Sequence, residues 1–429
     1  MAQVSVPYAK SVVTFTLPDE NLVGIYESSV HHCRPAADGL TLVEEALAQP
    51  MGSEPLPVLA RGKQRAVIIV SDHTRPVPSR SILPPMLRQL REGNPAIDIT
   101  LLVATGLHRA SSEDELRQKL GDDIYDHEKI VIHDSRDESN LCFLGILPSG
   151  GELWINQLAV DCDLLLAEGF IEPHFFAGFS GGRKSVLPGI AGTATVLANH
   201  CSEFIQSPLA RTGNLDGNPL HRDMLWAVRK ARLAFIVNVV INGAKEVIKA
   251  FAGDSVAAHD AGCEYLRGLC QVEVPPADIV ITSNGGYPLD QNIYQAVKGM
   301  TAGEFGSAPG TVIILAAACN DGHGGEQFYR FLAEAASPGE LLARLATVPQ
   351  AETLPDQWES QVLARVLNRH QVILLSDQCD PAIIRGLHLE VARTPAEALA
   401  KAFAIKGAGA RVAVIPDGVS VIATYKTGG

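Results

Sequence analysis

Short apolar runs that alternate with helical patterns constrain the fold of this chain most. The runs at Ala66–Val70, Ile97–Ala104 and Leu164–Ala167 are predominantly apolar, as expected for strands buried on both faces. Between the first two lies Ser79–Arg91, whose apolar residues recur at helical spacing. Strands and helices that alternate in this way form a parallel sheet with helices on both faces.

A second strand–helix series begins after Glu273, where the chain passes through Val274-Pro275-Pro276. The chain has 429 residues, too many for one typical core. We therefore predict an α/β fold with two domains, residues 1–273 and 274–429, each with a mainly parallel sheet flanked by helices. The last residues are free to return to the first domain. Because two such halves leave a cleft, we expect the active site between them.

The composition excludes several classes of protein. The apolar fraction of 46% and the charged fraction of 19% are those of a soluble globular protein. A net charge of −13 argues against nucleic acid and against an anionic membrane surface as partners. No apolar run reaches the ~18–20 residues of a membrane helix. Eight scattered cysteines without a C-x-x-C pair, and no apolar signal core in Met1–Lys10, predict reduced thiols and a cytoplasmic protein.

Polar clusters follow three of the predicted strands in the first domain. They are Ser71–Arg75, Gly106–Arg109 and Glu172–Lys184. Ligands of parallel sheets bind beyond the carboxyl ends of the strands, so these positions indicate an active site. Taken singly, Asp72 is explained equally well as a helix cap and His108 as a turn residue. Three strand ends that together carry His, Arg and Lys favour a site.

The third cluster contains a glycine-rich turn, Gly178-Phe-Ser-Gly-Gly-Arg-Lys-Ser185. Its spacing resembles a Walker A loop, but that motif requires glycine where Arg183 stands. Two interpretations remain open from the residues alone. One is an anion site whose backbone N–H groups approach a ligand and which presents Lys184. The other is an ordinary surface turn with two basic residues.

Taken in order along nearly the full length, the motifs resemble the nickel-pincer-nucleotide-dependent lactate racemase family of 2-hydroxyacid racemases and epimerases. The resemblance is carried by the following segments and residues: Ser71-Asp72-His73-Thr74-Arg75-Pro76, Thr105-Gly106-Leu107-His108-Arg109, Glu172-Pro173-His174, Gly181-Gly182-Arg183-Lys184-Ser185, Asn199-His200, Tyr294, Gln295, Lys298 and Trp358. The resemblance implies that the first domain carries the residue that tethers the cofactor and the catalytic histidines. The second domain contributes contacts to substrate and cofactor.

The resemblance implies a cofactor, a pyridinium-3-thioamide-5-thiocarboxylic acid mononucleotide that holds nickel. Lys184 is implied as its covalent attachment point and His200 as the protein ligand of the metal. Imidazole with sulfur donors in a planar array suits Ni(II). For the phosphate we expect backbone and hydroxyl contacts from Ser71, Thr74, Gly181 and Gly182. Asp72 is expected to bind the ribose hydroxyls.

The resemblance also implies a mechanism. The C–H bond of a 2-hydroxyacid is a very weak acid, so the family removes hydride to the cofactor while a base takes the hydroxyl proton. His108 and His174 are implied as the two bases, one for each enantiomer. Arg75 and Lys298 are expected to neutralise the substrate carboxylate or polarise its oxygen. An orienting role falls to Gln295 and a wall of the pocket to Trp358.

Two other functions remain open alternatives. The first is a metal- and nucleotide-dependent hydrolase or ligase that uses the glycine-rich turn, and the second is a non-catalytic protein that binds a small anion. If the family resemblance holds, the partners are a small 2-hydroxyacid substrate and the separate enzymes that make the cofactor. The side chain of that substrate is left open, although Phe175 and Phe176 suggest an apolar wall.

Overall fold

The computed structural model describes residues 1–426, which form two compact units. Unit 1 comprises Met1–Ser28, Cys201–Pro208 and the chain from Leu269 onwards, and unit 2 comprises Ser29–His200 and Leu209–Gly268. The expected division into 1–273 and 274–429 is thereby corrected at its beginning, because residues 1–28 belong with the C-terminal half. The short segment 201–208 does so too.

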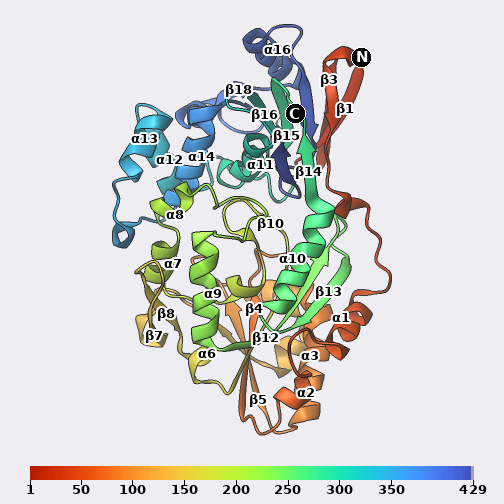
Figure 1. Ribbon diagram of the computed structural model, residues 1–429, viewed down its shortest axis with the longest axis vertical. Helices are drawn as coiled ribbons and strands as arrows, with labels where there is room; N and C mark the ends of the chain where they lie inside the picture. The colour runs from red at the N-terminus through yellow and green to blue at the C-terminus, as the bar shows by residue number, and fades with distance from the viewer. Residues whose placement is uncertain (427–429) are drawn as a thin grey trace. The chain divides into compact units, whose positions relative to one another are not determined.

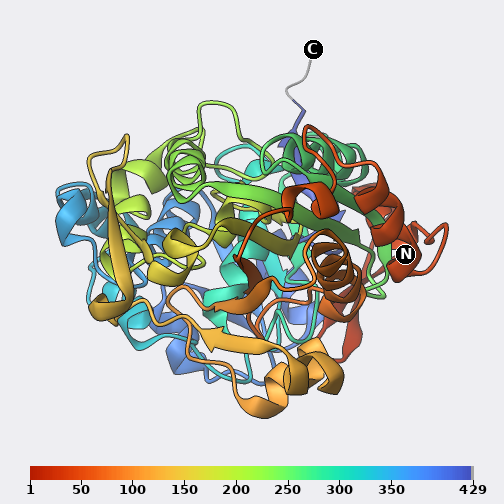
Figure 2. The ribbon, with the colours of Figure 1, turned by 90° about the horizontal axis from the view of Figure 1, so that it is seen from below.

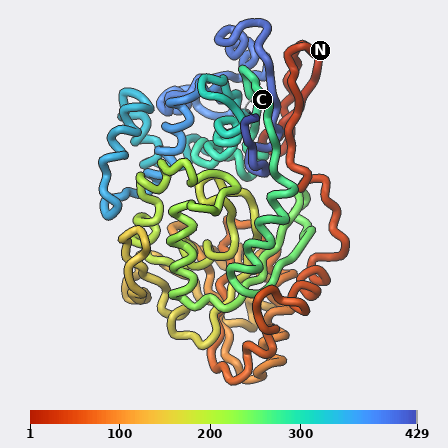
Figure 3. The backbone as a smooth tube through the Cα atoms, in the orientation of Figure 1, coloured from red at the N-terminus to blue at the C-terminus, as the bar shows by residue number. Residues whose placement is uncertain are grey.

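Strand pairing explains why the N-terminal residues join unit 1. β3 (Leu22–Ile25) runs parallel to β19 (Val412–Ile415) and closes one edge of that sheet. The preceding hairpin of β1 (Ala2–Tyr8) and β2 (Ser11–Leu17) buries its apolar side chains in the same core as the sheet. Figure 3 shows these red N-terminal strands beside blue strands from the end of the chain.

Unit 1 is built on a six-stranded, fully parallel sheet with the order β18-β17-β16-β15-β19-β3. Its other strands are β15 (Ile279–Ser283), β16 (Val312–Ala316), β17 (Gln371–Leu375), β18 (Glu390–Ala392), and the separate pair β14 (Gln271–Val274) and β20 (Ile422–Tyr425). Its helices are α8 (Ser202–Gln206), α11 (Ile293–Phe305), α12 (Glu326–Ala333), α13 (Pro338–Leu345), α14 (Gln357–Arg369), α15 (Pro381–Gly386) and α16 (Pro395–Lys406).

Unit 2 is built on a second six-stranded sheet with the order β13-β12-β9-β4-β5-β6, in which only β13 is antiparallel to its neighbour. The strands are β4 (Arg65–Ser71), β5 (Asp98–Ala104), β6 (Lys129–Ile132), β9 (Leu164–Phe170), β12 (Leu233–Ile241), β13 (Val247–Gly253), and the small pairs β7 (Leu141–Ile146) with β8 (Glu152–Asn156) and β10 (Pro173–His174) with β11 (Gly178–Phe179). The helices are α1 (Gly39–Ala48), α2 (Leu56–Leu59), α3 (Ser79–Gly93), α4 (Glu113–Leu120), α5 (Asp122–His127), α6 (Gln157–Asp161), α7 (Thr193–Asn199), α9 (Pro219–Ala231) and α10 (Ala257–Cys270).

Helices α1 to α5 cover one face of the unit 2 sheet, and their apolar residues form one core with alternate strand residues such as Ile68 and Leu101. Figures 1 and 2 show these red and orange helices beside the strands. Helix α4 begins with a capping box, in which Ser112 accepts from the Glu115 N–H and Glu115 accepts from the Ser112 N–H. The predicted α/β class with parallel sheets flanked by helices is confirmed.

Two features of the fold lie outside the sequence prediction. Helix α9 is amphipathic and starts with an Asn218 cap, but it was not predicted. Strand β1, which pairs with β2 in a hairpin, was not predicted either. Among residues 1–426, no helix combines the length and apolar character that a membrane crossing requires.

Candidate active site

The three polar clusters predicted in unit 2 follow neighbouring strands. β9, β4 and β5 are adjacent and parallel, so their carboxyl ends meet at one edge of the sheet. A backbone hydrogen bond of 3.0 Å from Gly106 N–H to Gly189 C=O further joins the loop after β5 to the segment that follows the glycine turn. The sheet order therefore gathers Ser71–Arg75, Gly106–Arg109 and Glu172–Lys184.

At the end of β4, the buried Asp72 carboxylate holds the His108 ring. Asp72 Oδ2 lies 2.7 Å from His108 Nδ1, and Oδ1 accepts from the Thr74 hydroxyl at 2.6 Å. Burial raises the pKa of Asp72, but the hydrogen bond and charge of His108 outweigh it, helped by Thr74 and Arg75, so the net pKa is lowered. An ionised Asp72 fixes the proton of a neutral His108 on Nδ1 and leaves the lone pair on Nε2.

This geometry gives Asp72 a contact that was not predicted. Both carboxylate oxygens accept hydrogen bonds inside the protein, and the residue is only 1% exposed. Asp72 therefore orients the His108 ring, and its expected contact with ribose hydroxyls stays a prediction. Thr74 and Arg75 are exposed on the same turn, and Ser71 donates its backbone N–H to Glu168.

Glu168 of β9 anchors the turn at Ser71–Arg75 through hydrogen bonds. Its Oε1 accepts from Ser71 N–H at 3.1 Å and from the Ser79 hydroxyl at 2.8 Å. Burial raises the pKa of Glu168, and the charge of Lys119 opposes that rise. Lys119 in turn donates to the Arg75 carbonyl at 3.0 Å. The signal for Glu168 in the sequence is an acid inside an apolar strand, but its role was not predicted.

An aromatic cluster joins the other predicted residues of unit 2. The Phe176 ring lies edge-on to His174 at 4.6 Å and to His200 at 5.4 Å, and Lys184 Nζ lies 5.9 Å from its centre. Phe175 stacks on the His174 ring, with the ring centres 5.0 Å apart. Of the two phenylalanines that were expected to form an apolar wall, Phe176 thus lies near His174, Lys184 and His200 together.

His174 is fixed by its backbone neighbours. It ends the two-residue strand β10, and its Nδ1 accepts from Ala177 N–H at 3.3 Å. In a neutral ring the proton therefore lies on Nε2, by assignment from this hydrogen bond. His174 and His108 accordingly differ in the tautomer that their surroundings favour.

His200 follows α7 and is 6% exposed. Its Nδ1 donates to the Val196 carbonyl at 2.9 Å, which places the lone pair of the neutral ring on Nε2. Burial lowers the pKa of His200 to about 3, and the charge of Lys184 contributes. A neutral imidazole whose second nitrogen is held by a carbonyl fits a metal ligand. Within residues 1–426 no group of three or more His, Cys, Asp or Glu side chains could hold a metal by itself.

The glycines of the turn are required by the protein interior. A Cβ at Gly182 would lie 2.6 Å from the His259 ring, and one at Gly181 would lie 2.7 Å from Asn238 Oδ1. Both backbones have positive φ, 73° and 51° for Gly181 and Gly182. The Gly182 N–H donates to Asn238 Oδ1 at 2.8 Å. The expected anion cradle at this turn is thus corrected for Gly182, whose N–H group is already used.

Arg183, the residue that interrupts the Walker pattern, points into the interior. Its side chain is 1% exposed and donates to the Ala177 carbonyl at 2.7 Å and to His221 Nδ1 at 2.9 Å, with His259 Nε2 at 3.0 Å. Burial lowers the pKa of Arg183 to about 10 and, with the arginine charge, that of His221 to about 3. The guanidinium therefore links the glycine turn to two neutral histidines. Because Arg183 is buried, Lys184 is the basic residue of this turn that a ligand can reach.

Replacing Arg183 should loosen this turn. We expect Arg183→Met to lower the free energy of unfolding by roughly 3 kcal/mol, because the Ala177 carbonyl and both imidazoles lose a charged donor. The exposed Arg109, paired with Glu115, provides a control, since Arg109→Met should change stability little. Denaturant unfolding of both variants measures the difference. Equal stability of the two variants would contradict the clamp.

In unit 1 the predicted residues lie on α11 and α14. Lys298 Nζ donates to Gln295 Oε1 at 2.7 Å, one turn apart on α11. Tyr294 precedes them, and burial raises its pKa, reinforced by the charges of Glu359 and Asp356. A hydrogen bond with Trp358 lowers the pKa of Tyr294, which links the start of α14 to α11. The four residues named from unit 1 thus form one group, joined by Asp356 and Glu359, which the sequence analysis did not identify.

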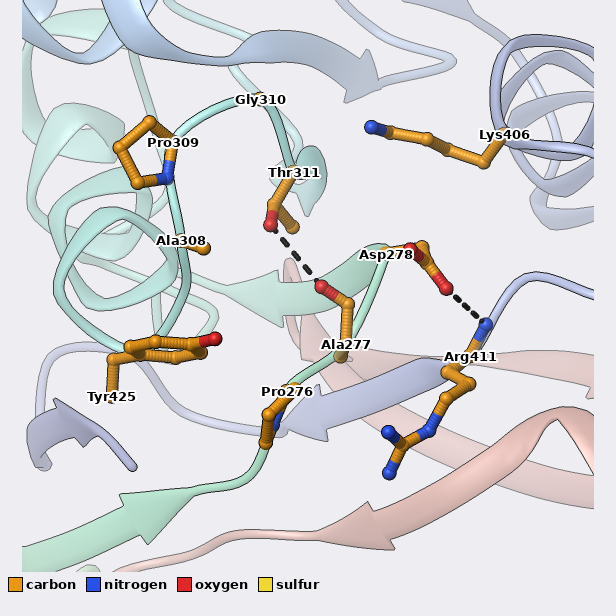
Figure 4. A pocket seen from close by; sticks show the side chains of 10 residues that line it. All are labelled: Pro276, Ala277, Asp278, Ala308, Pro309, Gly310, Thr311, Lys406, Arg411 and Tyr425. Atoms are coloured by element: carbon orange, nitrogen blue, oxygen red, sulfur yellow. Dashed lines mark hydrogen bonds between the residues drawn. The ribbon is translucent and has the colours of Figure 1, made fainter. Parts of the chain in front are cut away.

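A pocket of about 220 Å³ in unit 1 lies away from this group. It is lined by residues that precede β15, β16 and β19, among them Asp278, Thr311 and Arg411, so it lies at the amino ends of the strands (Figure 4). Asp278 Oδ2 accepts from the Arg411 backbone N–H at 2.8 Å. None of the predicted site residues lines this pocket, and we do not assign it to the active site.

The chain resembles characterised proteins over nearly its whole length. Residues 8–213 match the lactate racemase N-terminal domain family, and residues 272–423 match the lactate racemase C-terminal domain family. The lactate racemase of Thermoanaerobacterium thermosaccharolyticum is 52% identical over 426 residues, 99% of this chain and 100% of that protein. The lactate racemase of Lactiplantibacillus plantarum is 51% identical over 424 residues, 98% of this chain and 100% of that protein.

Solved structures agree with this. The lactate racemase apoprotein of T. thermosaccharolyticum superposes with a TM-score of 0.95 at 51% identity and covers 99% of this chain and 100% of its own. A crystal structure of a Thermotoga maritima protein has a TM-score of 0.64 at 20% identity, covering 92% of this chain and 99% of its own. The latter likeness shows the fold alone.

Proposed function

This chain belongs to the lactate racemase family, a family of isomerases, and on that premise we propose that it interconverts the enantiomers of lactate or a closely related 2-hydroxyacid. The proposal is carried by one observation in unit 2. Two imidazoles, His108 and His174, are each held at Nδ1 by a neighbouring group, Asp72 and the Ala177 N–H respectively. Racemisation through a planar 2-oxoacid requires a proton acceptor on each side of the substrate oxygen.

The imidazole rings of His108 and His174 start in different tautomers. Asp72 accepts the Nδ1 proton of His108, so the Nε2 lone pair of that ring is ready to take the hydroxyl proton of one enantiomer. His174 holds its neutral proton on Nε2 while Ala177 N–H occupies Nδ1. It therefore donates a hydrogen bond first and acts as a base only after its tautomer changes. Asp72 also stabilises the imidazolium that forms on His108.

The substrate carboxylate requires cations. Arg75 is exposed on the turn that carries Asp72, and a guanidinium binds a carboxylate with two parallel hydrogen bonds. We propose that Lys298, oriented by Gln295, contributes a second positive charge and that Trp358 bounds the substrate site.

The residues of unit 2 also fit the cofactor that the family resemblance implies. Lys184 acts electrostatically on His200, and both lie around Phe176, so a group attached at one would reach the other. We propose that Lys184 tethers a nickel-pincer nucleotide and that His200 ligates its nickel through Nε2. When bound, this group accepts and returns hydride, which avoids a carbanion at the substrate carbon. Other enzymes must make the cofactor and supply it to the chain.

Racemisation of a single enantiomer tests the proposal. We expect protein produced together with the cofactor-making enzymes to convert pure L-lactate or pure D-lactate into an equal mixture, measured by chiral chromatography. Protein produced without those enzymes should be inactive and should contain no stoichiometric nickel. Nickel-loaded protein that leaves both lactates and other 2-hydroxyacids unchanged would refute the function.

A further inference from the structure

The turn Ser71–Arg75 is held at both of its ends by side chains that have no part in the mechanism so far. At the first residue, Oε1 of Glu168 in β9 accepts from Ser71 N–H at 3.1 Å. At the last residue, Nζ of Lys119 in α4 donates to the Arg75 carbonyl at 3.0 Å. The two contacts fix different atoms at opposite ends of the turn, so each can be removed without the other.

Glu168 binds β4 at the point where the backbone pairing with β9 ends. The paired residues of β4 and β9 end at Ile69 and Ala167, although β4 stays paired with β5 up to Ser71. Glu168 Oε1 binds Ser71 N–H beyond that end and also accepts from the hydroxyl of Ser79, the first residue of α3, at 2.8 Å. One carboxyl oxygen thus joins the strand before the turn to the helix after it.

Packing alone does not account for an acid at position 168. The residue is 1% exposed, and its second oxygen, Oε2, has no hydrogen-bond partner within residues 1–426. A buried carboxyl group with an unpaired oxygen costs free energy that an apolar side chain would not. The acid contributes the two hydrogen bonds of Oε1, and both of them restrain the turn.

Hydrogen bonds inside the turn carry this restraint to Asp72. Its carbonyl accepts from Arg75 N–H at 3.3 Å, and its Oδ1 accepts from the N–H and the hydroxyl of Thr74 at 3.1 and 2.6 Å. Because the ends of the turn are fixed as well, the carboxylate has little freedom to move. Its Oδ2 is therefore kept at 2.7 Å from His108 Nδ1.

We propose that Glu168 and Lys119 are positioning residues for the reaction: Glu168 fixes the place of Asp72, and thereby the tautomer of His108, whereas Lys119 fixes the place of Arg75. The proposal rests on the proposed function, because it takes His108 as a base and Arg75 as the cation for the substrate carboxylate. Loss of the Glu168 bonds should then affect the oxidation of one enantiomer, and loss of the Lys119 bond should affect substrate affinity.

A first measurement needs no cofactor. Nitrogen NMR of protein labelled in its histidine rings distinguishes a neutral ring with its proton on Nδ1 from one with its proton on Nε2, and His108→Ala identifies the signals of His108. In the unmodified protein at alkaline pH, His108 should carry its proton on Nδ1, because Asp72 accepts it. In Glu168→Leu the Nε2–H form should become the major one. Asp72→Asn provides the reference spectrum for that form.

Three variants make the NMR measurement specific. Glu168→Gln keeps an oxygen acceptor for Ser71 and Ser79 and should keep the Nδ1–H form. Thr100→Val changes another buried polar residue of this sheet, opposite Val67 in β4 and away from the turn, and should also keep it. If Glu168→Leu does not fold, Ser79→Ala takes its place. It removes one of the two bonds of Oε1 and should give a mixture of both forms.

Kinetics of the cofactor-loaded enzyme provide the second measurement. In a single turnover, Glu168→Leu should oxidise one enantiomer roughly tenfold more slowly, namely the one that His108→Ala fails to oxidise, and the other within about twofold of the normal rate. Lys119→Met should raise the KM for lactate about tenfold and leave kcat within about twofold. Arg117→Met removes the exposed ion pairs of Arg117 in the same helix and should change neither constant.

The outcomes separate this proposal from the proposed function. A Glu168→Leu protein that keeps the Nδ1–H form, or that oxidises both enantiomers equally slowly, overturns the role of Glu168. An unchanged KM in Lys119→Met overturns the role of Lys119. Loaded protein that has no racemase activity removes the proposed function, and in that case the NMR spectra still report whether Glu168 controls the contact between Asp72 and His108.

Discussion

Lys184→Ala is expected to abolish both the covalent adduct and all racemase activity while the protein stays folded. The side chain is partly exposed and lies at the surface of the aromatic cluster, so its removal leaves the buried Arg183 clamp in place. Lysine is a nucleophilic amine that can form an amide-type link, and nothing else at this turn offers one. Intact mass and nickel content of protein produced with the cofactor-making enzymes measure the effect.

Two further variants make this test specific. Lys184→Arg keeps the positive charge but should also carry no adduct, because a guanidinium cannot form the same thioamide. Lys230→Ala, at an exposed lysine of α9, should keep both adduct and activity. An active enzyme with alanine at position 184 and no added mass would show that the tether has been assigned to the wrong residue.

The second large effect concerns the two histidines. His108→Ala and His174→Ala should each lose steady-state racemisation by roughly a hundredfold or more, the usual contribution of a positioned general base. In a single turnover, however, each variant should still oxidise one enantiomer to the 2-oxoacid. The permitted enantiomer should switch between the two variants, because each ring serves one face. Rapid quenching and quantification of the 2-oxoacid per site measure this directly.

The unmodified protein provides an internal comparison for the same experiment. His108 is set as a base by Asp72, whereas His174 must first exchange its tautomer, so the enantiomer served by His108 should be oxidised faster in the first turnover. His127→Ala, at an exposed residue of α5, should behave as the unmodified protein. If both alanine variants oxidised both enantiomers at equal rates, a single shared base or water would replace the two-base scheme.

The sequence by itself was sufficient to predict several strands and helices and the polar clusters that follow three of the strands. The apolar runs Ala66–Val70 and Leu164–Ala167 form buried strands, because consecutive apolar residues are typical of a strand covered on both faces. In the structure these two strands are adjacent and parallel. The Ser112 capping box is equally local, because it depends on residues three positions apart. The positions of polar clusters after strands then followed from the geometry of any parallel sheet.

The tertiary structure determined which side chains contact one another. The contact of Asp72 with His108 depended on the adjacency of β4 and β5, which brings its carboxylate to the imidazole. Arg183 looked like a basic residue of an anion site, but the contacts of His221 and His259 from distant helices turn it inward. Local patterns cannot contain such contacts, because they join residues far apart in the chain.

The same reason explains the remaining differences. β3 belongs to unit 1 because it hydrogen-bonds to β19 near the other end of the chain, a pairing that no local window of sequence contains. In the sequence, Glu168 and Glu359 look like ordinary acids. In the folded chain, burial raises the pKa of both carboxyl groups, and the charges of Lys119 and Lys298 oppose that rise. Residue types and their periodicity determined the elements of this protein. The charge states and roles of its acids followed only from burial and neighbours, which exist once the chain has folded.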